Sequence, residues 1–204
     1  FGINNVVLGV TGMLGFFTGS LAGATSRFLT YSLGEGDIEK TKRVFSAAFT
    51  IHVILAIIIF LLLETVGLWF LENKLVIPEG RMTAARVIFQ FSAFSCLLGI
   101  AQIPFSSALI AHEKMTVFAY FGIADVVMKL IIVLLLQIIV YDKLILYGLM
   151  FFLVSLGMMV ANRWYGITHF EECRFKLSLD KTLMMPMLKF SGWDMYGNMS
   201  VMAR

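Results

Sequence analysis

The chain has 204 residues, of which 59% are hydrophobic and 14% charged, and its formal net charge is +3. An ordinary soluble domain has fewer apolar residues and more charged ones, so the composition argues against a water-soluble globular protein and indicates an integral membrane protein. No nucleophile elbow, phosphate-binding loop, zinc motif or basic nucleic-acid-binding patch is present in the sequence. We therefore expect no enzyme, no cofactor, no metal and no nucleic-acid partner.

Long apolar segments alternate with short polar ones, and a helix needs about 20 such residues to cross a bilayer. The pattern predicts an all-α, polytopic bundle of transmembrane helices with five full spans and the start of a sixth. The spans are 3–31, 44–71, 86–111, 115–141 and 144–165, followed by a polar connecting segment at 166–189 and a new helix at 190–204. Because the chain begins at Phe1 and ends inside that last helix, we expect a piece of a longer protein.

Several local features refine this prediction. Four glycines at Gly12, Gly15, Gly19 and Gly23 lie on one helix face, which favours close packing against another backbone over a hinge. The two glycines within 33–37 predict the turn that ends the first helix. Glu64, near the end of the second span, is expected to reach water, and Pro104 is expected to kink the third span. The connection 112–114 reads as a solvated turn.

Successive connections between the predicted spans lie on alternate sides of the membrane and so form two sets. Lysine and arginine are unevenly divided between these two sets. By the positive-inside rule, the richer set is cytoplasmic, which places loops 32–43, 112–114 and 166–189 in the cytoplasm. The richer set contains Arg27, Lys40, Lys42, Arg43, Lys114, Arg163, Arg174, Lys176, Lys181 and Lys189, and the poorer set contains Lys74, Arg81, Arg86 and Lys143.

The span 115–141 carries two ionisable residues, Asp125 and Lys129. At about 1.5 Å per residue, Lys129 lies about 21 Å from Met115, which is close to the middle of the membrane. An ionisable side chain at this depth costs at least about 2–3 kcal/mol and is usually turned toward a polar interior. Because the two residues are four positions apart, they can pair on one helix face. The alternatives are a self-paired structural couple and a contact with a substrate or coupling ion, and we favour the second.

Three further polar residues are candidates for the same cavity. Arg27 lies closer to the cytoplasmic edge, where it can reach lipid headgroups or, if it faces inward, bind phosphate oxygens. Gln90 and Gln102 are interpreted as sharing roughly one face of their helix, either lining a sugar path or bonding between helices. Cys96 and Cys173 are too far apart in the sequence to indicate a disulfide framework.

The order and spacing of six short motifs resemble the polysaccharide-flippase branch of the multidrug/oligosaccharidyl-lipid/polysaccharide superfamily. The motifs are GSLAGATSRF at 19–28, LGEGD at 33–37, LVIPEGRM at 75–82, QIP at 102–104, AHEKM at 111–115 and FSGW at 190–193. The resemblance implies a MATE-like fold of two six-helix lobes around a central cavity. This chain would then correspond to helices two to six of the first lobe and the start of helix seven.

The resemblance also implies a function, which is to flip lipid-linked oligosaccharide units across the bacterial inner membrane by alternating access. The cargo carries an anionic pyrophosphate, so Lys129 and Arg27 would be its cationic contacts, with Gln90 and Gln102 near the glycan. Asp125 would oppose an anion unless it is paired or protonated, so it is the candidate for coupling to H⁺ or Na⁺. A cation-coupled multidrug antiporter and a non-transporting membrane assembly subunit are the alternative functions.

Overall fold

The computed structural model describes residues 2–74, 80–138, 143–174 and 180–202, with side chains from residue 18 onward except at 143, 195 and 198–202. Over these ranges the protein is helical, and the described part of the chain contains no strand. The elements are α1 (Gly2–Gly34), α2 (Ile38–Leu62), the π-helix η1 (Leu63–Gly67), α3 (Leu68–Asn73), α4 (Met82–Ala111), α5 (Met115–Ile138), α6 (Lys143–His169), the 3₁₀-helix η2 (Glu171–Cys173) and α7 (Lys181–Met202).

Four helical stretches are long and apolar enough to cross a membrane, and they are Ile38–Asn73, Met82–Ala111, Met115–Ile138 and Leu144–His169. They correspond to four of the five predicted spans. The remaining predicted span, 3–31, lies within α1, and it stays a prediction because its side chains are described only from residue 18. The end of the predicted span 115–141 falls on residues outside the described ranges.

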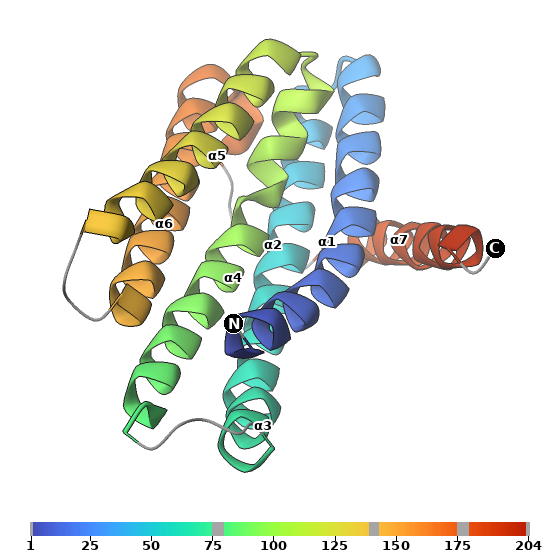
Figure 1. The fold of residues 1–204 in the computed structure, drawn as a ribbon. Coiled ribbons are helices and arrows are strands. Elements are labelled where there is room, and N and C mark those ends of the chain that lie inside the picture. The colour runs from blue at the N-terminus through green and yellow to red at the C-terminus, as the bar shows by residue number, and fades with distance from the viewer. Residues whose placement is uncertain (1, 75–79, 139–142, 175–179, 203–204) are drawn as a thin grey trace.

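The segment 166–189 differs from the predicted polar connection. Helix α6 continues to His169, η2 follows, and α7 already begins at Lys181 rather than near residue 190. Asp180 explains the earlier start, because its carboxylate accepts a hydrogen bond from the backbone N–H of Thr182 at 3.0 Å, as an N-cap does. In Figure 1, α7 runs across the direction of the other helices and projects from the bundle.

Helix α4 lies at the centre of the bundle and packs against α1, α2, α5 and α6 (Figure 1). Small side chains allow this close packing on several sides, and the buried alanines of α4 are Ala84, Ala85, Ala93, Ala101, Ala108 and Ala111. Against α2, the ring of Phe105 lies 5.4 Å from that of Phe45 and 5.8 Å from that of Phe49, measured between centroids. Edge-to-face contacts of this kind add about 0.5–1.5 kcal/mol each to the burial of the rings.

Close helix approaches occur at glycines of α6 and at Gly67 of η1, and not at the described glycines Gly19 and Gly23 of α1. A Cβ atom at Gly148 would lie 2.9 Å from Ile88 Cγ1 and 3.3 Å from Ile88 Cα, and one at Gly166 would lie 2.9 Å from Phe105 Cδ1. Both contacts join α6 to α4. By contrast, a Cβ atom at Gly19 or Gly23 would meet nothing within 4 Å. The predicted packing role is therefore wrong for these two glycines within the described chain.

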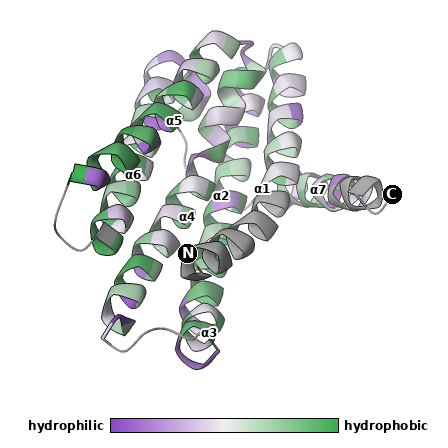
Figure 2. Cartoon of the chain, viewed as in Figure 1, coloured by the Kyte–Doolittle hydropathy of each residue, from purple (hydrophilic) through white to green (hydrophobic). Residues whose placement is uncertain are grey.

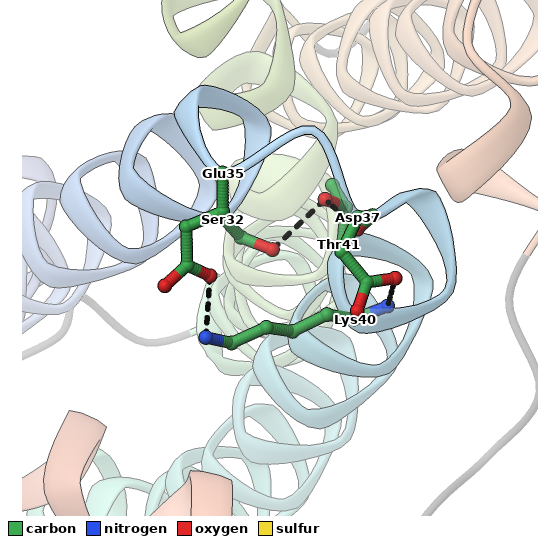
Figure 3. Close-up of polar contacts among 5 residues, drawn as sticks. All are labelled: Ser32, Glu35, Asp37, Lys40 and Thr41. Atoms are coloured by element: carbon green, nitrogen blue, oxygen red, sulfur yellow. Dashed lines mark hydrogen bonds and ion pairs between the residues drawn. The ribbon is translucent and has the colours of Figure 1, made fainter.

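The predicted turn after the first helix is confirmed, and its polar contacts are shown in Figure 3. Gly36 has φ 74°, a left-handed conformation that glycine adopts without strain. Asp37 caps α2 by accepting a hydrogen bond from the backbone N–H of Lys40 at 3.0 Å, and the Lys40 ammonium pairs with Glu35. Thr41 Oγ1 donates to the carbonyl of Asp37, so Ser32 donates to Thr41 Oγ1 at 2.8 Å.

Three predicted cytoplasmic connections gather at one end of the bundle. Lys42, just after the α1–α2 turn, lies 3.8 Å from Glu171 in η2. His112, in the α4–α5 turn, pairs with Glu172 in the same 3₁₀-helix. These contacts place the α1–α2 turn, the α4–α5 turn and η2 together, as expected for connections that share one side of a membrane. In Figure 2, by contrast, most residues along α5 and α6 have the colour of hydrophobic residues.

The contacts of Gly148 generate a prediction about stability. Gly148→Ala is expected to lower the free energy of unfolding by about 1–3 kcal/mol, because the added methyl group overpacks the α4–α6 contact. Gly157→Ala is the matched control on the same helix, since its Cβ would meet nothing within 4 Å and alanine favours the helix by about 1 kcal/mol. Thermal unfolding of the purified full chain in detergent measures both. Equal effects of the two substitutions would contradict the close packing of Gly148 against α4.

Candidate functional site

Asp125 and Lys129 form the predicted pair on α5. Lys129 Nζ donates to Asp125 Oδ2 at 2.6 Å, and the two side chains are 37% and 30% exposed. The ammonium group also lies 4.9 Å from the centroid of the Phe151 ring on α6. An aromatic face attracts a cation and strengthens its hold when water is excluded. The pair is thus covered on the α6 side and accessible from the other.

Helix α5 as a whole is on the outside of the bundle. Among its described residues only Ile132 is buried, and large apolar side chains next in sequence to the pair, such as Val126 and Leu130, are exposed. Asp125 and Lys129 are therefore not buried between the described helices, and these helices do not form a closed cavity around them. Whatever medium or partner lies against the open side of α5 also contacts this pair.

Arg27 is not brought to Lys129. It is exposed on α1, and its guanidinium Cζ lies 4.9 Å from the centroid of the Phe190 ring on α7. Helices α1 and α5 lie on different sides of α4 (Figure 1). The two predicted cationic contacts therefore belong to different surfaces of the described bundle. The residues around Phe190 on α7 also line an open hollow, formed by Lys189, Gly192, Trp193 and Tyr196.

Gln90 and Gln102 do not share a face, so that interpretation was wrong. Twelve positions at 100° each leave them about 120° apart around α4. Gln90 Nε2 donates to Glu64 Oε2 at 3.0 Å, whereas Gln102 Oε1 is buried with no hydrogen-bond partner among the described residues. Gln90 therefore bonds between helices, which was one of its two predicted roles.

Glu64 corrects a second expectation. The residue is partly exposed, but its carboxylate turns toward α4, where Oε2 accepts from Gln90 and Oε1 is buried without a partner in the described structure. Glu64 belongs to η1, the π-helical turn between α2 and α3. The sequence contained a signal for this pair, because Glu64 and Gln90 each interrupt an apolar span, but their proximity depends on how α2 and α4 pack.

His52 is a buried polar residue that the sequence reasoning missed. It is 0% exposed, and its Nδ1 lies 2.8 Å from the carbonyl of Ala48. A carbonyl can only accept, so Nδ1 carries the proton, and the neutral ring keeps Nε2 as an acceptor with no partner among the described residues. Helical spacing places His52 on the same face of α2 as Phe45 and Phe49, which pack against α4.

His112 also departs from the predicted solvated turn. Its Nε2 pairs with Glu172 Oε1, and its ring stacks on Phe170 with 4.1 Å between centroids. The Glu172 side chain is only 3% exposed, so this carboxylate depends on His112 for a polar partner. The contact joins the α4–α5 turn to η2. Among the described residues, no group of three or more His, Cys, Asp or Glu side chains is arranged to hold a metal ion.

Comparison of the chain with known protein families, with curated proteins and with solved structures finds no match in any of the three. The case for a function therefore depends on the residues and contacts described above.

The His112–Glu172 pair leads to a prediction about stability. Glu172→Gln is expected to lower the free energy of unfolding by about 1–3 kcal/mol, because it replaces a charge-assisted hydrogen bond to a buried group. Glu171→Gln is the matched control, since this neighbouring side chain is 74% exposed. Chemical unfolding of the purified chain compares them. A loss as large in Glu171→Gln as in Glu172→Gln would show that the pair has no special role.

Cys173 should be unreactive in the folded protein. Burial raises the pKa of its thiol, and the nearby Glu172 carboxylate raises it further. Because the thiolate is the nucleophile, a maleimide is expected to modify Cys173 at least about tenfold more slowly in the native chain than after unfolding, at neutral pH. Mass mapping of the labelled peptides, in a Cys96→Ser background, measures this. Rapid labelling of the native chain would contradict the burial of Cys173.

Proposed function

We propose that the chain is part of a flippase that moves lipid-linked oligosaccharide units across the bacterial inner membrane. The observation that carries the proposal is the Asp125–Lys129 pair, which lies at membrane depth on the uncovered side of α5. The resemblance of the motifs to the polysaccharide-flippase branch supplies the cargo class. The physical argument for a transport path comes from the pair itself.

Two charged groups facing pure hydrocarbon would be unstable even when paired, because pairing offsets only part of the cost of leaving water. The exposed fractions of 37% and 30% mean that the described helices do not supply the missing polar surroundings. The open side of α5 therefore faces water or polar groups. A hydrated path between two lobes, as the resemblance implies, meets this requirement, and the large apolar side chains flanking the pair are suited to the polyprenyl tail.

The pair also suggests how an anionic cargo is held and released. Lys129 Nζ lies 2.6 Å from Asp125 Oδ2, so the two charges offset each other. A pyrophosphate at the open side offers several acceptor oxygens, so Lys129 exchanges its carboxylate partner for the cargo. Asp125 then binds H⁺ or Na⁺ to lose its charge, which links the cargo to a coupling ion. Arg27, over Phe190, would contact the cargo or lipid headgroups on a separate surface.

The proposed orientation has the α1–α2 turn, the α4–α5 turn and η2 in the cytoplasm. The positive-inside rule supports it, because Lys40, Lys42, Arg43, Lys114 and Arg174 belong to these connections. The presence of an acid at the site favours one further candidate, a cation-coupled multidrug antiporter, in which Asp125 would bind the cationic drug or the ion. An assembly subunit would instead bury the pair against a partner protein.

Replacing Lys129 tests the proposal in the intact protein. Lys129→Ala is expected to abolish delivery of the glycan to the cell surface while the protein remains in the membrane, because the anionic head loses its contact at mid-membrane. Surface glycan on a gel and the protein level in isolated membranes are measured together. Normal surface glycan with Lys129→Ala would remove this residue from the site.

Lys74→Ala is the matched control. Its ammonium also lies over an aromatic ring, at 5.8 Å from the centroid of Trp69, but just beyond the end of α3 rather than within a span. It should leave glycan delivery unchanged. If export of a cationic drug falls with Asp125→Asn while glycan delivery is normal, the antiporter is the better description.

A further inference from the structure

We infer that a buried water-binding site lies where α1, α2 and α4 meet, with His52 as its central residue. The site is separate from the candidate transport site on α5 and does not depend on the proposed function. Three buried atoms define it, one from each helix, and none has a hydrogen-bond partner among the described residues. They are Ser20 Oγ, His52 Nε2 and Gln102 Oε1. Ser20 and His52 are each more than nine-tenths buried.

Helices α2 and α4 run antiparallel in a register that two contacts fix. The ring centroids of Phe49 and Phe105 are 5.8 Å apart, and Gln90 Nε2 donates to Glu64 Oε2 at 3.0 Å. Glu64 follows Phe49 by 15 positions, and Gln90 precedes Phe105 by 15 positions. Between these two contacts, each residue of one helix can therefore be matched with the residue at the same depth on the other.

This register places His52 opposite Gln102. His52 is three positions after Phe49, and Gln102 is three positions before Phe105. A step of three keeps a residue on roughly the same helix face, so both side chains continue the seam that the two rings begin. Neither His52 Nε2 nor Gln102 Oε1 bonds the other in the described structure, so a bridging molecule can serve both.

Helix α1 brings Ser20 to the same depth. Ser32 Oγ and Thr41 Oγ1 are 2.8 Å apart, next to the turn that joins α1 to α2. Ser20 precedes Ser32 by 12 positions, and His52 follows Thr41 by 11, so the two residues differ by only about 2 Å in depth along these antiparallel helices. The hydroxyl of Ser20 and the ring of His52 are therefore at one level of the bundle.

Packed side chains cover this level on the α7 side. Leu21 of α1 and Ile51 of α2, next in sequence to Ser20 and His52, belong to one buried cluster with Met187 of α7. Met187 is itself almost completely buried. A molecule at this level is therefore enclosed by the protein on that side rather than open to lipid.

The chemistry of the site requires a hydrogen-bond donor. His52 Nδ1–H donates to the Ala48 carbonyl, so Nε2 can only accept, and Gln102 Oε1 is an acceptor as well. Pro104, inside α4, has no N–H, so the carbonyl of Ile100 loses its usual helical donor about 3 Å along the helix from Gln102. Acceptors therefore outnumber donors here, and a water molecule supplies two donors in a small volume.

Space is available beside Gln102. Gly99, three positions earlier on roughly the same face of α4, adds no side chain, and a Cβ atom there would meet nothing within 4 Å. A buried water needs little more than its own volume and about three polar partners. Both requirements are met by this face of α4 together with His52 and Ser20.

A metal cation fits the site less well than water, because the three helices provide no negative charge near it. Helix α4 contains no Asp or Glu. On the α1 and α2 side, the nearest acids are Glu64, 12 positions after His52, and those of the α1–α2 turn, so each is at least about 18 Å away along its helix. Asp194 of α7 is about 10 Å beyond Met187. The charge of a cation would therefore remain uncompensated among buried groups.

X-ray radiolytic labelling tests the inference. X-rays convert a bound water into a hydroxyl radical, which adds to the nearest ring, and dissolved oxygen completes the oxidation. The full chain in native membranes is irradiated at neutral pH, and oxidised peptides are mapped by mass. We expect His52 to be modified at least about tenfold faster than Phe45, after each rate is divided by the intrinsic reactivity of the side chain. Phe45 is the matched control, because it is equally buried on the same helix, about 10 Å away.

A water-soluble radical scavenger identifies the source of the radicals. It removes radicals formed in bulk water but does not reach those formed inside the bundle. The scavenger should therefore slow the labelling of Trp164, which is exposed, and leave the labelling of His52 unchanged. Loss of the His52 label in the scavenger would show that the radical came from outside, which would overturn the inference.

Matched variants locate the water. Gln102→Leu should slow the labelling of His52 at least about threefold, because the water loses one of its acceptors. Gln90→Leu, the same substitution on the same helix but about 18 Å away, should leave it unchanged. If Gln102→Leu fails to accumulate, the rates of His52 and Phe45 in the unaltered chain still decide the question.

Two outcomes overturn the inference. If His52 is modified no faster than Phe45, the seam is dry and its polar side chains bond one another directly. If about 100 mM sodium chloride, in place of choline chloride at constant ionic strength and pH, protects His52, the site holds a cation rather than water. We expect labelling to be the same in the two salts.

Discussion

Polar groups within this bundle have to find partners in the protein, because the medium around an apolar helix offers none. Local bonding meets most of this need, as hydroxyls and amides donate to the carbonyl four residues earlier. Thr50 donates to Ser46, Ser95 to Phe91 and Asn162 to Met158. The ionisable residues need a side-chain partner as well, and their contacts mark the positions where a helix does more than face lipid. Asp125 bonds Lys129, and Glu64 turns to Gln90.

The same constraint explains why α4 is the central helix. Without a strong hydrophobic drive between helices in lipid, association depends on close van der Waals packing, so small residues gather where backbones meet. The contacts at Gly148 and Gly166 of α6, and at Gly67 of η1, all involve side chains of α4. Phe105 of α4 fills the space between α2 and Gly166. This packing positions Gln90 opposite Glu64.

The ionisable residues lie in different parts of this arrangement. Lys129 and Asp125 are on the open side of α5, where an external molecule can reach them, whereas the carboxylate of Glu64 turns toward Gln90 of α4. The end of the bundle that holds His112 and Glu172 joins the α4–α5 turn to η2, just before α7. This pair therefore ties the turn that precedes α5 to the short helix that precedes α7 in the chain.

The sequence by itself determined that the chain is helical and apolar, where the first turn falls and that Asp125 can pair with Lys129, because these depend on local spacing along one helix. It could not determine which helices touch. The partners of Glu64 and His112 lie 26 and 60 positions away, and the glycines of α1 and α6 look equally suited to packing until a neighbour is present. Only the tertiary structure decided these points. Whether a residue is buried, and which residue it contacts, depends on both helices that meet, whereas a sequence pattern describes the face of one helix.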